Sequence, residues 1–215
     1  MALAFASVIL DVDSTLCGLE GIDWLAERRG ADVGKQVTLL TDRAMRGEIP
    51  LDSVYAERLA LVRPGVDDIR ALTTAYIAAL APGAKWAIGR LQDLGCRIVL
   101  VSGGLREAIL PVASLVGIPN RDVHAVSVML TAANTYGGFE TASPLATAEG
   151  KRAVAARLGL PKPVLAVGDG VTDLAMRPAV DAFAAYVGFV RRARVVSDAD
   201  YVVDSFDQLL QVILE

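Results

Sequence analysis

Residues 8–16 read VILDVDSTL, an apolar run that ends in two acids separated by a single valine. The run predicts a buried strand over residues 5–13. Alternate residues of an extended strand face the same side, so Asp11 and Asp13 are expected to point the same way. Two like charges so close repel unless a cation or a shared proton separates their roles. The stretch therefore predicts a strand that delivers two carboxylates to one site.

Two further apolar runs, at 96–104 and 163–170, predict buried strands of the same kind. Helical patterns at 82–95, 105–117 and 151–159 lie around them, and each of these segments ends in glycine. Alternating strands and helices are typical of a doubly wound parallel α/β sheet. Ligands bind such sheets at the carboxyl ends of the strands, where Asp11, Ser102 and Asp169 would meet.

Residues 18–78 interrupt this alternation. Four helical patterns, at 21–30, 35–49, 51–62 and 66–80, are separated by turn signals at 47–50 and 63–65. The sequence thus predicts a core formed by residues 1–16 and 79–215, and a helical insert of residues 17–78. An insert beside strand ends is well placed to act as a lid, although the pattern fits a plain structural excursion equally well.

Two later segments carry weaker signals. Residues 124–140 alternate and contain a Gly-Gly pair, which is compatible with a short hairpin. The tail at 199–215 predicts a short strand and a closing helix. We interpret His124, Tyr136 and Phe139 as structural residues.

Composition narrows the class of protein. The chain has 215 residues, of which 53% are hydrophobic, enough for one large domain or a core with an insert. The net charge of −4 disfavours a nucleic-acid partner, because binding phosphates needs clustered basic residues. No run of about 20 apolar residues predicts a membrane span. Cys17 and Cys96 lack metal-ligand spacing, so reduced thiols in a cytoplasmic protein are expected.

The acids at the strand ends suit phosphate chemistry with a metal. An isolated Asp-x-Asp pair is more often a turn or a surface pair, but Asp169 and Asp173 add a second acidic strand end. Mg²⁺ prefers hard oxygen ligands and leaves room for a substrate phosphate. One acid of the first pair can attack phosphorus while the other transfers a proton. The residues alone leave open which acid does which.

A phosphate group also needs donors that hold it. Ser102 offers a hydroxyl, Gly103 and Gly104 let the backbone approach closely, and a helix that begins near Leu105 adds its positive end. Lys151 offers a cation. Each of these signals is weak alone, since Ser-Gly-Gly is usually a turn and most lysines are solvated.

Together these motifs resemble a known superfamily. DVDST (11–15), VSGG (101–104), Lys151 and GDGVTD (168–173) are similar, in order, to the four motifs of the haloacid dehalogenase-like hydrolases. Segments 20–26, 43–51 and 57–62 resemble the helical cap of its phosphoserine phosphatases. The resemblance implies a Rossmann-like core with a helical cap inserted after the first strand.

The resemblance also implies roles for individual residues. Asp11 would be the nucleophile and Asp13 the general acid/base; Ser102, the Gly103 amide and Lys151 would hold phosphate. Mg²⁺ would bind Asp11, the Asp13 carbonyl and Asp169, with Asp173 in support; Glu20 would meet the substrate ammonium, Arg58 its carboxylate, and Thr172 would line the site.

The expected reaction is Mg²⁺-dependent hydrolysis of O-phospho-L-serine through an aspartyl-phosphate intermediate, the last step of serine biosynthesis. The expected protein is a cytoplasmic monomer or homodimer without a nucleic-acid or membrane partner. Leu51, where some family members carry an aromatic residue, and the shorter segment 144–152 favour an alternative substrate such as phosphohomoserine or a phosphosugar. A non-enzymatic protein that binds a phosphorylated ligand is a further alternative.

Overall fold

The computed structural model describes residues 3–45, 49 and 51–214, but not the side chains of residues 42, 44, 45, 51 and 52. The chain forms a six-stranded, all-parallel sheet in the order β3-β2-β1-β6-β7-β8. Its strands are β1 (Ser7–Leu10), β2 (Arg97–Leu105), β3 (Val123–Val126), β6 (Val164–Gly168), β7 (Ala182–Tyr186) and β8 (Tyr201–Val203). The predicted doubly wound sheet is confirmed, and β1 lies at its centre.

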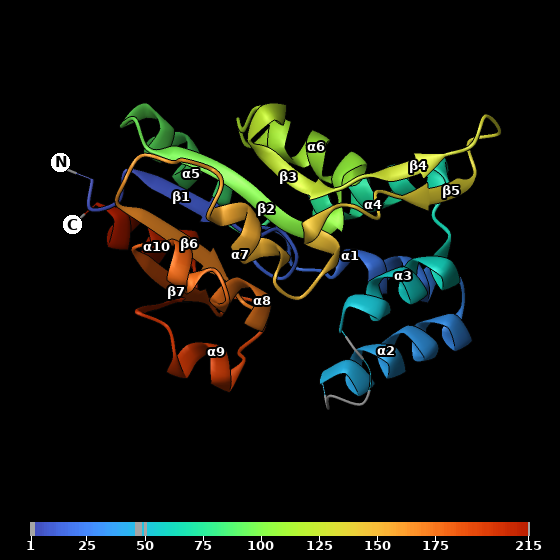
Figure 1. Ribbon diagram of the computed structural model, residues 1–215. Helices are drawn as coiled ribbons and strands as arrows, with labels where there is room; N and C mark the ends of the chain where they lie inside the picture. The colour runs from blue at the N-terminus through green and yellow to red at the C-terminus, as the bar shows by residue number, and fades with distance from the viewer. Residues whose placement is uncertain (1–2, 46–48, 50, 215) are drawn as a thin grey trace.

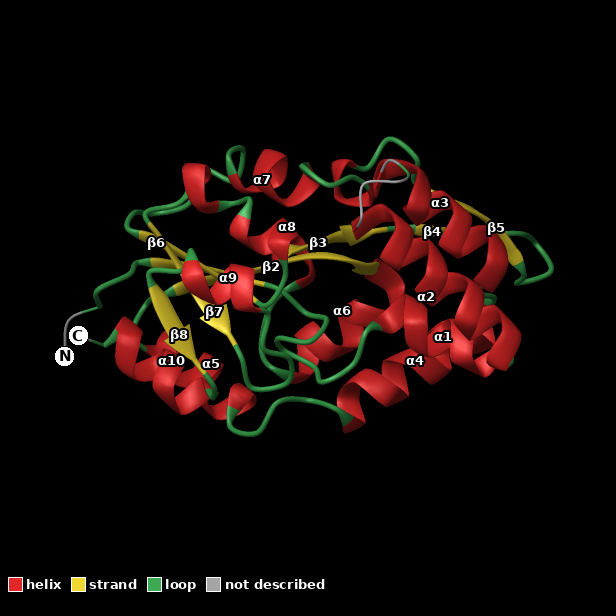
Figure 2. Cartoon of the chain, turned by 90° about the horizontal axis from the view of Figure 1, so that it is seen from below, coloured by secondary structure: helices red, strands yellow, loops and turns green. Residues whose placement is uncertain are grey.

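Helices cover both faces of the sheet (Figure 1). They are α5 (Ala84–Asp93), α6 (Arg106–Leu115), α7 (Gly150–Ala155), α8 (Val171–Leu174), α9 (Ala193–Ser197) and α10 (Phe206–Ile213). Figure 2 shows α7 on one side of the strands and α5 and α10 on the other. The two ends of the described chain lie together, and the Ala4 amide donates to the Ile213 carbonyl. None of the described helices is long and apolar enough to cross a membrane.

The central strands are apolar on both faces because helices cover both faces. Ile9, Leu10 and Leu100 are at most 1% exposed. Burying one such side chain contributes about 1.5–3 kcal/mol. The strands are therefore held firmly, and the positions of their carboxyl ends are well defined.

Three sequence predictions need correction. The first strand ends at Leu10, so Asp13 lies in the turn beyond it, where Ser14 adopts a positive φ of 51°. β7 was not predicted, because its Ala-rich sequence AFAAY carries little strand signal. The expected hairpin exists as β4 (Val128–Leu130) and β5 (Tyr136–Phe139), but residues 123–126 before it form β3 of the main sheet.

Four helices, α1 (Gly21–Arg28), α2 (Ala31–Met45), α3 (Leu51–Val62) and α4 (Val66–Ala78), lie between β1 and α5 in the chain. They gather at one end of the sheet, beside the hairpin (Figure 1). The segments that enter and leave this group pair with each other: Gly18 N–H donates to Ala79 O and Ala81 N–H to Leu16 O. The division into a core and an insert of residues 17–78 stays a prediction. Most of the predicted turn at 47–50 falls outside the described residues.

Candidate active site

A cavity of about 410 Å³ opens beyond the carboxyl ends of β1 and β6. These neighbouring strands are the point where the chain reverses its winding direction across the sheet, the usual ligand position in such folds. The sheet and the helices α1–α3 both contribute to its lining. Of the predicted site residues, the lining contains Asp11, Asp13, Glu20, Arg58, Gly103, Lys151, Asp169, Thr172 and Asp173.

Asp11 and Asp173 share the ammonium group of Lys151. Lys151 Nζ lies 2.6 Å from Asp11 Oδ1 and 2.5 Å from Asp173 Oδ1, and all three residues are buried. Burial and the Asp173 carboxylate hold the pKa of Asp11 well above its usual range. Burial alone would favour a neutral amine, but the carboxylates of Asp11 and Asp173 outweigh it and raise the pKa of Lys151. Lys151 is therefore charged. Its single positive charge contacts two carboxylates, those of Asp11 and Asp173.

Asp169 completes the acidic group. Its Oδ1 accepts from the Thr15 hydroxyl at 3.3 Å, and its Oδ2 lies 3.0 Å from Arg192 Nη2, an ion pair without hydrogen-bond geometry. Burial and Asp173 raise its pKa to about 7. The glycine before it allows this close packing, because a Cβ at Gly168 would lie 2.2 Å from Asp173 Cγ.

The three acids fit a hard divalent cation. Asp11, Asp169 and Asp173 each offer an oxygen, and these oxygens lie within 4.8 Å of one another. Burial first, and the neighbouring Asp173 carboxylate second, raise the pKa values of Asp11 and Asp169, so a bound cation would favour the charged form of both acids. An oxygen-only set with excess negative charge is what Mg²⁺ binds in proteins. The Asp13 side chain stands outside this set, as expected if only its carbonyl binds the metal.

Asp13 is held from the helical side instead. Its Oδ1 accepts two hydrogen bonds, from the Gly21 amide at 2.8 Å and from the Tyr76 hydroxyl at 2.6 Å. Burial, followed by the charge of Glu20, raises the pKa of Asp13 to about 6. A carboxyl group with such a pKa carries a proton more readily near neutral pH than an exposed aspartate does.

The glycine-rich loop, residues 102–104, is the carboxyl-terminal part of β2 itself. Gly103 and Gly104 line the cavity, whereas Ser102 is fully buried behind them and its Oγ accepts from the Gly104 amide at 2.9 Å. A side chain at position 104 would approach Asp13 Oδ2 to 2.9 Å. Glycine there lets the loop lie directly against the acid.

Glu20 and Arg58 line the opposite wall, and each already has a partner. Glu20 accepts from the Ser14 hydroxyl at 2.8 Å and lies 3.5 Å from Arg192. Arg58 Nη2 pairs with Asp23, which comes from α1. Among the described residues none hydrogen-bonds the buried Arg58 Nε, and Arg58 as a residue lines the cavity.

Sequence reasoning missed four residues that contact the site: Asp23, Tyr55, Tyr76 and Arg192. Asp23 lies three residues after Glu20, one helical turn away, so the two can share a face. Tyr55 and Arg58 are likewise three apart on α3. Tyr76 and Arg192 reach the site only through the folding of distant segments, and no local pattern marks them.

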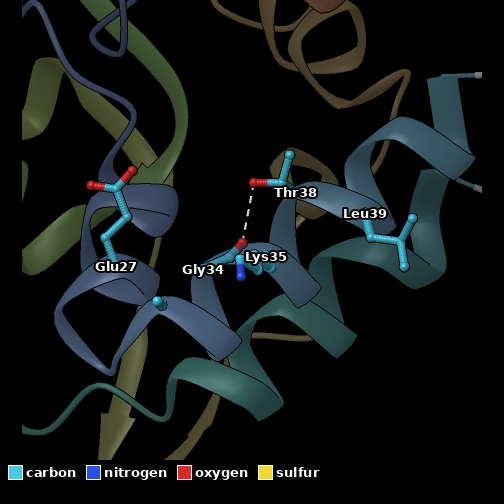
Figure 3. Close-up of a pocket in the computed structure, with 6 residues that line it drawn as sticks. Glu27, Gly34, Lys35, Thr38 and Leu39 are labelled. Carbon is cyan, nitrogen blue, oxygen red and sulfur yellow. Dashed lines mark hydrogen bonds between the residues drawn. The ribbon is translucent and has the colours of Figure 1, made fainter.

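A second hollow, of about 640 Å³, lies on α1 and α2 and is lined by Glu27, Ala31, Gly34, Lys35, Thr38 and Leu39. Figure 3 shows these side chains with one hydrogen bond among them, from Thr38 Oγ1 to Gly34 O. None of these residues belongs to the acidic group, so we place the chemistry in the first cavity.

A doubly wound parallel sheet with buried carboxylates and a lysine at the winding switch is the architecture of an α/β enzyme that binds its ligand at the carboxyl ends of the strands. The chain belongs to the haloacid dehalogenase-like hydrolases, whose family model matches residues 5–181. The resemblance drawn from the four motifs is thereby confirmed.

Within that family the chain is similar to proteins named phosphoserine phosphatase. It is 35% identical over 207 residues to the one from Rattus norvegicus, covering 95% of this chain and 91% of the relative. It is 34% identical over 209 residues to the chloroplastic one from Arabidopsis thaliana, covering 95% and 70%. A phosphoserine phosphohydrolase-like protein from Francisella tularensis has a similar structure, with a TM-score of 0.85, 25% identity and coverage of 96% and 99%.

Proposed function

We propose that the protein is a Mg²⁺-dependent phosphatase that converts O-phospho-L-serine to L-serine and phosphate. The observation that carries the proposal is one cavity with two different walls: Asp11, Lys151 and Asp169 on the sheet side, and Glu20 and Arg58 on the helical side. The named relatives, at 34–35% identity over nearly the whole chain, support it.

The second wall matches the rest of the proposed substrate. Phosphoserine carries an ammonium and a carboxylate besides its phosphate. Glu20 offers the charge that attracts the ammonium, and Arg58 also lines the cavity. A guanidinium fork fits a carboxylate with paired hydrogen bonds.

In the proposed reaction a carboxylate oxygen of Asp11 attacks phosphorus, and the bond between phosphorus and the seryl oxygen breaks. Asp13 donates its proton to that oxygen, so serine leaves as a neutral alcohol. Asp13 then accepts a proton from water, which attacks phosphorus and releases phosphate from Asp11. Lys151, the Gly103 amide and the Ser102 hydroxyl, which lies buried behind the two glycines, would hold the phosphoryl oxygens.

Asp11, Asp169 and the Asp13 carbonyl would hold Mg²⁺, with Asp173 in support. When bound, the ion would offset the negative charge of the phosphate and of the buried acids. Lys151 contributes in the same sense from the protein, because its ammonium lies between Asp11 and Asp173.

The test is phosphate release by the purified protein from phosphoserine, phosphohomoserine, a phosphosugar and p-nitrophenyl phosphate, with and without Mg²⁺. We expect the highest kcat/KM for phosphoserine and little turnover without the metal. Efficient hydrolysis of another monoester, with none of phosphoserine, would overturn the proposed substrate.

One observation favours the alternative of a different small phosphomonoester. Leu145, Ala146 and Thr147 line the cavity and belong to the segment 144–152 that departs from the resembling family. The side chain of Leu51, the other departure, lies outside the described residues. The same substrate panel decides between the two candidates, and absence of turnover with every substrate would favour a binding protein.

Other expectations stay predictions. Cys17 and Cys96 are both free thiols, in line with the cytoplasmic location that we propose. The monomeric or homodimeric state and the lack of a nucleic-acid partner remain expectations from the sequence.

A further inference from the structure

Tyr55 links the helical wall of the cavity to the glycine-rich loop at the end of β2. It lies on α3, lines the cavity, and donates a hydrogen bond from its hydroxyl to the Gly103 carbonyl at 2.9 Å. The Gly103 carbonyl belongs to the peptide that joins Gly103 to Gly104. The N–H of that same peptide donates to Ser102 Oγ at 2.9 Å. The peptide is therefore held at both ends, by a side chain from α3 and by one from β2.

This peptide needs such a restraint. A peptide flanked by two glycines has no Cβ on either side, so its plane rotates with little steric resistance. The structure places its carbonyl toward Tyr55 and its N–H toward Ser102. A rotated peptide would direct a carbonyl oxygen toward Ser102, and an oxygen there would repel a phosphate group.

The orientation also sets what Ser102 can do. A hydroxyl oxygen that accepts the Gly104 N–H still has its own proton to donate. Phosphate oxygens accept hydrogen bonds, so this proton suits them. Hydrogen bonds in such a chain also strengthen one another.

The Tyr55 hydroxyl is itself well placed to act as a donor. Burial raises the pKa of Tyr55, so the hydroxyl keeps its proton. The ring packs edge-on against Phe139 of β5, with centroids 5.3 Å apart, and this contact fixes where the hydroxyl lies.

We propose that Tyr55 is a positioning residue for phosphate binding: by holding the Gly103–Gly104 peptide, it keeps the loop, and the Ser102 hydroxyl behind it, in place for a phosphoryl group. The inference rests on the proposed function only in that a phosphate group occupies this loop. It assigns to α3 a role in phosphate binding separate from that of Arg58, since the hydroxyl acts on the loop and needs no contact with the substrate.

The test is Tyr55→Phe, which removes the hydroxyl and keeps the ring. The matched control is Tyr136→Phe, the same change in the neighbouring hairpin at a residue that does not line the cavity. Binding of inorganic phosphate in the presence of Mg²⁺ is measured by calorimetry, and its inhibition constant is measured against p-nitrophenyl phosphate. For Tyr55→Phe we expect the dissociation constant and the inhibition constant of phosphate each to rise about three- to tenfold, the range for losing one hydrogen bond. For Tyr136→Phe we expect a change of less than about twofold, with Tm close to the wild-type value in both variants.

A second measurement separates positioning from general loosening of the fold. In a Ser102→Ala background, Tyr55→Phe should weaken phosphate binding by less than about twofold further, because the two changes break one chain of hydrogen bonds. A full additional three- to tenfold loss, or unchanged phosphate binding by Tyr55→Phe alone, would overturn the inference. Neither inorganic phosphate nor p-nitrophenyl phosphate contains serine. If the protein prefers another monoester, phosphoserine is ruled out as the substrate, but this test of Tyr55 is still valid.

Discussion

The two walls of the cavity are built differently. On the sheet side, Asp11, Lys151, Asp169 and Asp173 are almost fully buried and pack against one another. Asp11 and Asp169 directly follow strands β1 and β6, whereas Lys151 lies on α7 and Asp173 on α8. On the helical side, the charged groups are more exposed: the Glu20 side chain retains 45% of its exposure. In the proposed reaction the sheet wall would face the phosphate that every monoester shares, and the helical wall would face the part that differs between substrates. Changes in the first wall should therefore affect turnover of all substrates, and changes in the second should affect their choice.

The largest effect is expected from Asp11→Asn. An amide cannot act as the nucleophile, so kcat should fall by at least about 10³-fold for every monoester tested. Steady-state phosphate release measures the loss. Asp67→Asn, at an exposed aspartate of α4, is the control and should retain full activity. Normal turnover by Asp11→Asn would remove the proposed nucleophile from the sheet wall.

Asp169→Asn tests whether the sheet wall binds a metal. At a Mg²⁺ concentration about 100 times Kd, binding should stabilise the wild-type protein by about 2.7 kcal/mol, which raises Tm by about 5–10 °C. The variant should lose most of this rise, and its kcat/KM should fall by about 100-fold or more. Thermal denaturation with and without Mg²⁺ provides a readout independent of activity.

The exposed Asp93→Asn, at the end of α5, should respond to Mg²⁺ as the wild type does. An undiminished Tm rise in Asp169→Asn would place the metal elsewhere.

Arg58→Ala tests the helical wall. Loss of a charge-assisted hydrogen bond should raise KM for phosphoserine about 10- to 100-fold. KM for phosphoethanolamine, which lacks the carboxylate, should change by less than about threefold. Arg63→Ala, at a residue that follows α3 and contacts Tyr136 outside the cavity, is the matched control. Equal losses for both substrates would show that Arg58 does not distinguish the carboxylate.

The smallest effect is expected from Arg70→Ala on α4. Arg70 pairs with Asp67 at 3.3 Å, but both side chains are largely exposed. Water and salt screen such pairs, so the free energy of unfolding should change by less than about 0.5 kcal/mol. Urea denaturation measures it. A larger loss would mean that exposed charges of the helical segment matter more than the comparison of the two walls implies.

The acids of the sheet wall were predicted well because each is marked by a pattern in the residues next to it. Each of these acids follows an apolar run within a few residues, and parallel strands bring their carboxyl ends to one edge. Knowing the order of motifs was then enough to group Asp11, Lys151 and Asp169. The prediction that Asp13 lies on the first strand was wrong, because a strand pattern in the sequence does not show where the chain turns.

The helical wall was only partly predictable because its contacts join distant segments. Tyr76 reaches Asp13 across 63 residues, and Arg192 follows the unpredicted strand β7. Residue type gave little help, since an isolated tyrosine or arginine on a helix or loop is usually a packing or solvent-exposed residue. Glu20 and Arg58 were found only through resemblance, and resemblance gave no indication that Asp23 already pairs with Arg58.

The paired segments at residues 16–18 and 79–81 also limit how this protein could be re-engineered. The donors that fix Asp13 come from both sides of that junction, Gly21 just after it and Tyr76 just before it. A chimera with different helices grafted between residues 18 and 79 would lose both hydrogen bonds to Asp13, the proposed general acid/base. Any such transplant must carry the first turn of α1 and the last turn of α4 along with the core.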